Sequence, residues 1–269
     1  MDIERPRYTL GSLFAGIGGF ELGLERGIPG LETIWQVEQE PFCQRVLKKH
    51  WPKAQIYDDV REVGVHNLEP IDILCGGFPS QDISLANIKG EGLNGKKSGL
   101  WFEMGRLISE LRPRIVVMEN VAAITIRGLD RVLGDLSELG YNAEWGIISA
   151  RDLGAPHLRK RWFCIAYLSD SDRKRYGKKM QSRFAPINNK RSVVYEKRSQ
   201  STQKQICESE IQKTSPWERS YDKPKFQRVA NGVSYRLDKN RLKALGNAIV
   251  PQCSELIGRY IANSGLLED

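Results

Sequence analysis

The chain has 269 residues, 40% of them hydrophobic, and carries a formal net charge of +8 at pH 7. This length allows one large core together with a smaller module or a long insertion. No run of about eighteen apolar residues occurs, as a membrane-spanning helix would need, and the start "MDIERPRYTL" has no apolar stretch of signal-peptide length. We therefore expect a soluble, cytoplasmic protein without a membrane partner.

The five cysteines are scattered, form no CxxC pair and have no histidine at ligand spacing. An odd number of dispersed cysteines is typical of free thiols in a reducing compartment and argues against a structural zinc site. We therefore expect no bound metal. Cys75 and Cys164 lie inside apolar runs, so we interpret them as small core residues.

The positive charge is concentrated in residues 169–228, which hold 16 Lys/Arg and seven Asp/Glu, a net of +9. This segment is rich in Ser and Gln and lacks apolar periodicity. A polyanion is the expected partner of such a segment, and a disordered linker is the alternative. The predicted organisation is a first domain over 1–168, the basic segment over 169–228, and a C-terminal segment over 229–269 that completes the first domain.

Up to residue 168, short apolar runs alternate with amphipathic stretches. The runs predict strands near residues 8–16, 33–39, 71–77, 114–121, 143–150 and 162–168. Apolar spacings of three and four predict helices over 20–27, 40–51, 100–113 and 128–141. This alternation is typical of a doubly wound α/β domain with a mostly parallel sheet. Near the C-terminus, Asn247 is expected to begin a helix whose buried face is Ile249, Cys253, Leu256, Ile257 and Ile261.

The first predicted strand leads into "FAGIGGFELGLE", residues 14–25. Its three early glycines let the backbone turn tightly and let a ligand approach it, as in nucleotide-binding βα turns. The spacing differs from GxGxxG, since Glu21 stands at the third glycine position. Glu38, at the end of the second predicted strand, can accept hydrogen bonds from ribose hydroxyls, and Asp59 follows one helix later. A glycine turn with two surface carboxylates is the alternative.

Four further motifs follow this one in order: "GGFPSQDIS", "MENV", "RDLGAPHLRKRWF" and "ALGNAIVP". Together the five motifs resemble the bacterial and phage DNA cytosine 5-methyltransferases, over about residues 8–168 and 228–262. The resemblance implies a Rossmann-like methyltransferase fold, S-adenosyl-L-methionine as cofactor and S-adenosyl-L-homocysteine as product. It also implies a cytosine flipped out of double-stranded DNA as substrate, and a restriction-modification setting. We expect a monomer.

The resemblance implies roles for individual residues of the cofactor site. The glycine loop would enclose the methionine end, Glu38 would hold the ribose, and Asp59 and Val60 would hold the adenine. Asn247 and Val250 would close the site from the C-terminal side. The full set implied for the cofactor is Phe14, Ala15, Gly16, Ile17, Gly18, Gly19, Glu38, Gln39, Asp59, Val60, Gly77, Asn247, Ala248 and Val250.

The other motifs imply a site for the base. The loop at Pro79 would bring a nucleophile to the cytosine, and Asn120 would hold that loop. Glu119 would bond ring nitrogen 3 and the exocyclic amine. Arg161 would bind the base carbonyl, with Arg159 beside it. His157 stands where many relatives have glutamine, and we interpret it as tolerated variation.

The chain departs from the family at the nucleophile, because Ser80 stands where the family has cysteine. A cysteine is partly thiolate near neutral pH and can add to carbon 6 of the base. A serine hydroxyl is almost wholly protonated, and the motif holds no general base to activate it. We therefore expect impaired catalysis with binding retained. Two origins fit: an engineered Cys→Ser substitution, which the intact other motifs favour, or a naturally silenced DNA-binding pseudoenzyme.

Two segments are expected to face the DNA. Residues 80–101, rich in glycine and including Gln81 and Ser84, would form a lid over the flipped base, with a long surface loop as the alternative. The basic segment occupies the position of the target-recognition region, where Lys and Arg bind phosphates. Its first cationic residues, here called the basic cluster, are Arg173, Lys174, Arg175, Lys178 and Lys179.

Besides the DNA-binding pseudoenzyme, two rival functions remain open. The RNA-directed branch of the same family typically has Pro-Pro-Cys where this chain has "FPS", so Phe78 favours DNA. A nicotinamide-dependent dehydrogenase would explain neither "ENV" nor the paired arginines.

Overall fold

The computed structural model describes residues 7–79, 99–126, 128–168 and 235–268. Ser80, Gln81, Ser84 and the basic cluster lie outside the described residues, as does the whole predicted target-recognition region.

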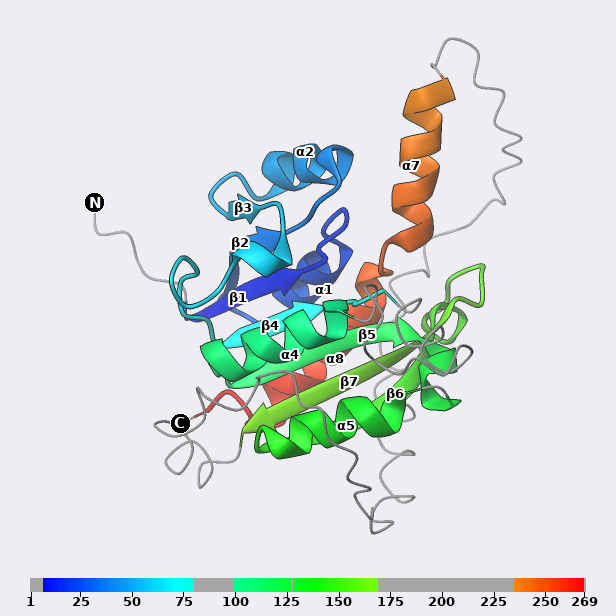
Figure 1. Ribbon diagram of the computed structural model, residues 1–269. Coiled ribbons are helices and arrows are strands. Elements are labelled where there is room, and N and C mark those ends of the chain that lie inside the picture. The colour runs from blue at the N-terminus through cyan, green and yellow to red at the C-terminus, as the bar shows by residue number, and fades with distance from the viewer. Residues whose placement is uncertain (1–6, 80–98, 127, 169–234, 269) are drawn as a thin grey trace, which may run out of the picture.

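The described part of the chain forms one seven-stranded sheet in the order β3-β2-β1-β4-β5-β7-β6 (Figure 1). Neighbouring strands from β3 to β5 pair in parallel, whereas β7 runs antiparallel to both β5 and β6. The parallel strands therefore place their carboxyl ends at one edge of the sheet. The bounds are β1 (Tyr8–Leu13), β2 (Leu31–Val37), β3 (Gln55–Tyr57), β4 (Ile73–Gly76), β5 (Ile115–Val121), β6 (Tyr141–Ser149) and β7 (Lys160–Leu168).

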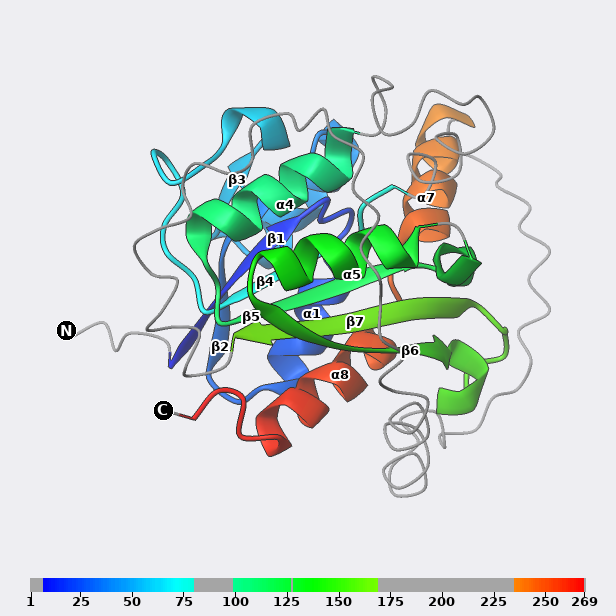
Figure 2. The ribbon, with the colours of Figure 1, turned by 60° about the horizontal axis from the view of Figure 1, so that its bottom comes forward.

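Helices cover both faces of this sheet. The pair α4 and α5 lies on one face, and α1 and α8 lie on the other (Figures 1 and 2). The α-helices are α1 (Gly19–Gly27), α2 (Pro41–His50), α4 (Gly99–Leu111), α5 (Leu129–Glu138), α7 (Tyr235–Asn247) and α8 (Pro251–Asn263). The described residues also form the short 3₁₀ helices η1 (Val60–Glu62), η3 (Ala122–Ile126) and η4 (Ala150–Leu153).

Successive residues of the central strands enter two different cores. In β4, Ile73 and Cys75 pack on the α1 and α8 side, while Leu74 packs on the α4 and α5 side. All three are fully buried. A strand that must be apolar on both faces reads as a continuous apolar run, which is why the sequence predicted it. The doubly wound α/β fold is thereby confirmed, and so is the burial of Cys75 and Cys164.

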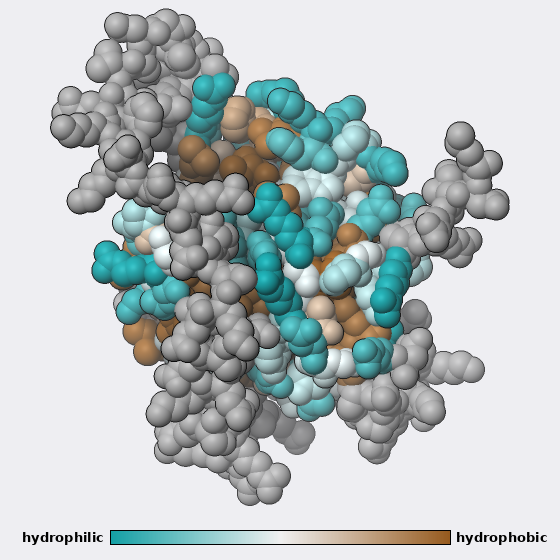
Figure 3. All heavy atoms as spheres, turned by 180° about the vertical axis from the view of Figure 1, so that it is seen from behind, coloured by the Kyte–Doolittle hydropathy of each residue, from teal (hydrophilic) through white to brown (hydrophobic). Residues whose placement is uncertain are grey.

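Helices α1 and α8 approach each other closely through glycines. A Cβ added at Gly23 would overlap the carbonyl oxygen of Pro251. The Ser254 hydroxyl donates a hydrogen bond of 3.1 Å to the carbonyl of Gly19. The C-terminal helix therefore lies directly against the helix that follows the glycine loop. Seen from behind, this side of the molecule shows a band of hydrophilic residues beside apolar surface (Figure 3).

Two expectations about the elements are corrected. Asn247 is the last residue of α7 and does not begin a helix; α8 begins at Pro251, since proline is favoured in a first turn where its missing N–H costs nothing. Cys253, Leu256, Ile257 and Ile261 are buried on α8 as predicted, whereas Ile249 precedes that helix. The short edge strand β3 and the reversed direction of β7 were not predicted.

Candidate functional site

A cavity of about 420 Å³ lies at the carboxyl ends of the parallel strands. It is lined by residues that follow four of them: Gly16 after β1, Glu38 after β2, Gly77 after β4 and Glu119 near the end of β5, with Asn247 from α7. Successive connections run from β1 towards β3 on one side and from β4 towards β5 on the other. The cavity therefore lies at the switch point of the sheet, where open α/β folds bind ligands.

The glycine loop after β1 forms one wall of this cavity. Phe14 has a φ of 56°, which is rare for a residue with a side chain, and Gly16 and Gly18 have φ values of 58° and 83°. A Cβ added at Gly16 would meet no atom within 4 Å, so the loop leaves open space there. Backbone strain held in this way is common at ligand sites. Ala15 is buried, and its N–H donates to the carbonyl of Val37 at 3.1 Å.

Glu38 connects the glycine loop to the end of β2. One carboxylate oxygen accepts the N–H of Gly16 at 2.7 Å, and the other accepts the N–H of Glu40 at 2.8 Å. Each oxygen still has a second lone pair for a ligand hydroxyl. The carboxylate thus shapes the loop as well as lining the cavity, a role that the sequence did not indicate.

A smaller cavity of about 190 Å³ shares Phe14, Glu38 and Pro79 with the first. Its other lining residues are Val37, Gln39, Asp58, Val60 and Leu100. Asp59 has a different contact: its side chain caps η1 by accepting the N–H of Arg61 at 3.0 Å. Most of this lining is apolar, which suits a flat aromatic ring.

Glu119 lies on the opposite wall and is paired with Arg161. The Arg161 Nε lies 2.9 Å from Glu119 Oε1, and the Glu119 side chain is 12% exposed. Burial raises the pKa of Glu119 to about 7, although the charges of Arg161 and Arg159 oppose this shift. A Cβ at Gly77 would come within 2.9 Å of Glu119 Oε2, so only glycine leaves the carboxyl group undisturbed.

Asn120 holds the segment that follows β4. Its Nδ2 donates to the carbonyl of Phe78 at 2.9 Å, and its own Oδ1 accepts the N–H of Val121 at 2.8 Å. Pro79, the next residue, lines both cavities. The last described residue before Ser80 therefore lines the same cavity as Phe14 of the glycine loop and Glu119.

Arg159 makes contacts that the motif alone did not indicate. Its guanidinium donates to the carbonyl of Gly246 at 2.9 Å and to that of Ala248 at 2.5 Å. Burial and the nearby Arg161 lower the pKa of Arg159. Arg159, which immediately precedes β7, thus anchors the end of α7 and the residue that follows it, which keeps Asn247 at the cavity.

A second link between α7 and the cavity was missed by sequence reasoning. Lys243 Nζ lies 2.7 Å from a carboxylate oxygen of Glu40, and both residues line the larger cavity. A single lysine and a glutamate about two hundred positions apart carry no local sequence signal. Of the other predicted cofactor residues, Ile17 lies in the glycine loop, Gly19 is the first residue of α1, and Val250 immediately precedes α8.

Neither a metal site nor a membrane span is found in the described ranges. No group of three or more His, Cys, Asp or Glu residues there could hold a metal ion. No helix among the same residues is long and apolar enough to cross a membrane.

Comparison with known proteins gives concordant matches. The profile of the C-5 cytosine-specific DNA methylases matches residues 8–249. The Type II methyltransferase M.Sau3AI of Staphylococcus aureus is 35% identical over 192 residues, which cover 63% of this chain and 45% of the relative. The Type II methyltransferase M.CviJI of Paramecium bursaria Chlorella virus IL3A is 34% identical over 160 residues, 59% of this chain and 42% of the relative.

The chain therefore matches less than half the length of either relative. A solved structure of the Entamoeba histolytica methyltransferase EhMeth superposes with a TM-score of 0.53 at 17% identity, covering 71% of this chain and 57% of that one, which shows a shared fold. Because the family profile spans most of the sequence and includes the whole glycine loop, Glu119 and Asn247, the chain belongs to the C-5 cytosine-specific DNA methylase family.

Proposed function

We propose that this protein is built to transfer a methyl group from S-adenosyl-L-methionine to carbon 5 of a cytosine flipped out of double-stranded DNA. The observation that carries the proposal is one cavity with two chemically different walls. Glu38 and the glycine loop form one wall, and the pair of Glu119 and Arg161 forms the other.

The cofactor wall fits an adenosyl amino acid. The open space at Gly16 leaves room for a ligand against the backbone, and Glu38 keeps lone pairs for ribose hydroxyls. The smaller cavity offers apolar surfaces from Phe14, Val37 and Val60 to a purine ring. When bound, the cofactor would supply an electrophilic methyl group; the protein itself orients it and excludes water.

The opposite wall fits the base. With a pKa near 7, the carboxyl group of Glu119 is partly protonated at neutral pH and can donate a hydrogen bond to a ring nitrogen. Arg161 is held by Glu119 and supplies a cationic donor for a carbonyl oxygen. The two groups together would stabilise the charge that develops on the ring after addition at carbon 6.

The nucleophile is the missing part. Ser80 follows Pro79 in the chain, and a serine hydroxyl without a general base adds slowly to carbon 6. The cysteines within the described ranges do not replace it, since they are all buried and burial raises the pKa of each. We infer that the chain binds cofactor and DNA but turns over poorly.

Restoring the nucleophile tests this proposal. Ser80→Cys should produce methylated cytosine in double-stranded DNA, detected by bisulfite sequencing, whereas the Ser80 protein should give little or none. Rapid methylation by the Ser80 protein would contradict the role given to this position.

Ser80 also favours a second candidate, a DNA-binding pseudoenzyme. That function predicts retained binding of S-adenosyl-L-homocysteine and duplex DNA, with no methylation even after Ser80→Cys. The same assay with a single-stranded RNA substrate separates both candidates from an RNA methyltransferase.

A further inference from the structure

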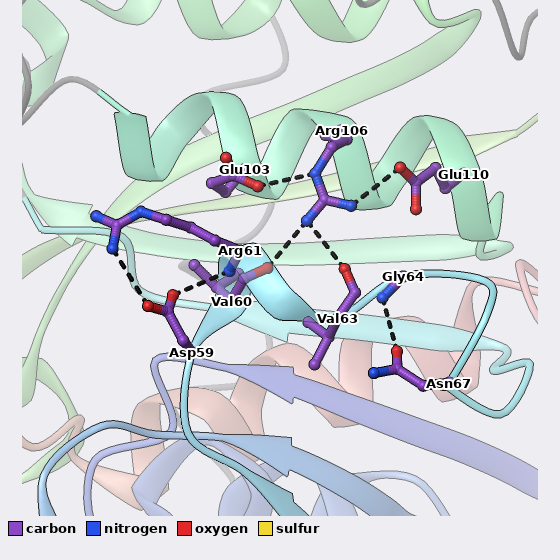
Figure 4. A network of polar contacts seen from close by, with 9 residues as sticks. All are labelled: Asp59, Val60, Arg61, Val63, Gly64, Asn67, Glu103, Arg106 and Glu110. Carbon is purple, nitrogen blue, oxygen red and sulfur yellow. Dashed lines mark hydrogen bonds and ion pairs between the residues drawn. The ribbon is translucent and has the colours of Figure 1, made fainter.

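Arg106 stands at the centre of a polar network on α4 (Figure 4). Its Nε and Nη1 bind two carboxylates of its own helix, Glu103 at 2.8 Å and Glu110 at 2.9 Å. Its remaining nitrogen, Nη2, leaves the helix and donates to the carbonyls of Val60 at 2.9 Å and Val63 at 3.0 Å. One side chain therefore joins α4 to the backbone of η1 and the residue that follows it.

The two carboxylates fix the direction of this side chain. Glu103 and Glu110 lie three residues before and four residues after Arg106, on the same face of the helix. Burial works against the charge of the guanidinium, but the bonds to both carboxylates outweigh it and raise the pKa of Arg106. The planar fork of arginine can serve all four partners at once, which the ammonium of lysine cannot.

One of the two carbonyls that Arg106 binds belongs to Val60, a residue of the wall of the smaller cavity. Val60 lines that cavity from η1, and Leu100 lines it from the first turn of α4. The strand before η1 is β3, which is only three residues long and lies at the edge of the sheet. A wall that follows so short an edge strand needs another anchor, and the bonds from Arg106 supply it.

We propose that Arg106 is a positioning residue for the cofactor: it holds Val60 at the distance from Leu100 that a purine ring requires. This inference rests on the proposed function, because the purine belongs to the cofactor proposed for this cavity. Arg106 acts through the backbone of η1 and makes no contact with the reacting atoms.

Calorimetric binding of S-adenosyl-L-homocysteine tests the inference on the full chain, without any need for turnover. Arg106→Met should weaken binding about tenfold, since hydrogen bonds from a charged donor to two carbonyls are removed. The affinity of Arg106→Lys should lie between those of Arg106→Met and the unchanged chain, because lysine keeps the positive charge but lacks the planar guanidinium. Arg131→Met is the matched control, since Arg131 makes the same kind of pair four residues from Asp135 on α5. It should change affinity less than twofold.

A second ligand separates positioning from general loss of structure. S-Inosyl-L-homocysteine lacks the purine amino group, so its affinity relative to S-adenosyl-L-homocysteine reports recognition of the purine edge. Arg106→Met should bring the two affinities closer together, whereas Arg131→Met should leave their ratio unchanged. If Arg106→Met retains the ratio and the affinity, the inference is wrong. If the unchanged, folded chain does not bind S-adenosyl-L-homocysteine at all, the proposed function fails instead.

Discussion

Glu38 offers the sharpest test of the cofactor wall, because its carboxylate has two structural partners besides any ligand. Replacing it with alanine removes the acceptors of the Gly16 and Glu40 N–H groups. The loop would then lose the bond that holds Gly16 at the cavity, and the ribose would lose its acceptor. Both effects weaken cofactor binding in the same direction.

The size of the loss follows from the bonds involved. Hydrogen bonds to a charged group contribute roughly 1.5–3 kcal/mol, and part of this is recovered when water replaces the carboxylate. We expect Glu38→Ala to weaken binding of S-adenosyl-L-homocysteine by about 1–3 kcal/mol, which is roughly a five- to 140-fold higher dissociation constant. The dissociation constant of Glu38→Gln should lie between those of the unchanged chain and Glu38→Ala. One oxygen of the glutamine remains as an acceptor, while its NH₂ group faces the other backbone N–H.

Isothermal titration calorimetry measures this directly. Glu32→Ala is the control, since Glu32 lies on β2, the strand that ends just before Glu38, and its carboxylate forms an exposed pair, 3.9 Å from Lys53. Such surface pairs contribute little, so this variant should bind normally. Equal dissociation constants for Glu38→Ala and Glu32→Ala would refute the assignment of Glu38 to cofactor binding. Glu38 would then be a surface carboxylate that does not contact the cofactor.

Three further predictions concern the base, the DNA and the core. In the Ser80→Cys background, Glu119→Gln should lower the methylation rate while the affinity for S-adenosyl-L-homocysteine stays the same. A large loss of that affinity would contradict the assignment of Glu119 to binding of the base. Neutralising the basic cluster should make the dependence of duplex binding on salt shallower, by about 0.9 in log–log slope for each phosphate that the cluster no longer neutralises, and an unchanged slope would mean that the cluster does not bind phosphate. Glu21 is fully buried, and burial raises its pKa to about 7. The stability that this higher folded-state pKa contributes is therefore present below about pH 4.5 and lost as the pH rises through 7. Glu21→Gln has no ionisable group at this position, so its free energy of unfolding should fall less between pH 5 and pH 8 than that of the unchanged chain, by up to about 3 kcal/mol. Urea unfolding at the two pH values measures this difference. Parallel pH profiles of the two proteins would contradict the raised pKa of Glu21.

Local patterns in the sequence were sufficient for six of the seven strands described and for most of the helices. The run "IDILCGG" reads as a strand buried on both faces because each side chain of β4 enters an apolar core. The direction of β7 was beyond such reasoning, since "WFCIAYL" has the same apolar pattern whichever way it runs. Its antiparallel pairing with β5 and β6 depends on how the ten residues after β6 turn back.

The sequence by itself determined the family motifs and the residue types at the site, including the glycine loop, Glu119 and the serine at position 80, because these signals are local and ordered along the chain. Tertiary structure alone decided which groups meet. Arg159 binds the backbone beside Asn247, and Arg106 binds the backbone of Val60. The carbonyls in these bonds belong to every residue type and leave no trace in the sequence. Likewise, the pKa of Glu119 depends on how deeply β5 and β7 bury it beside Arg161, which is a property of packing.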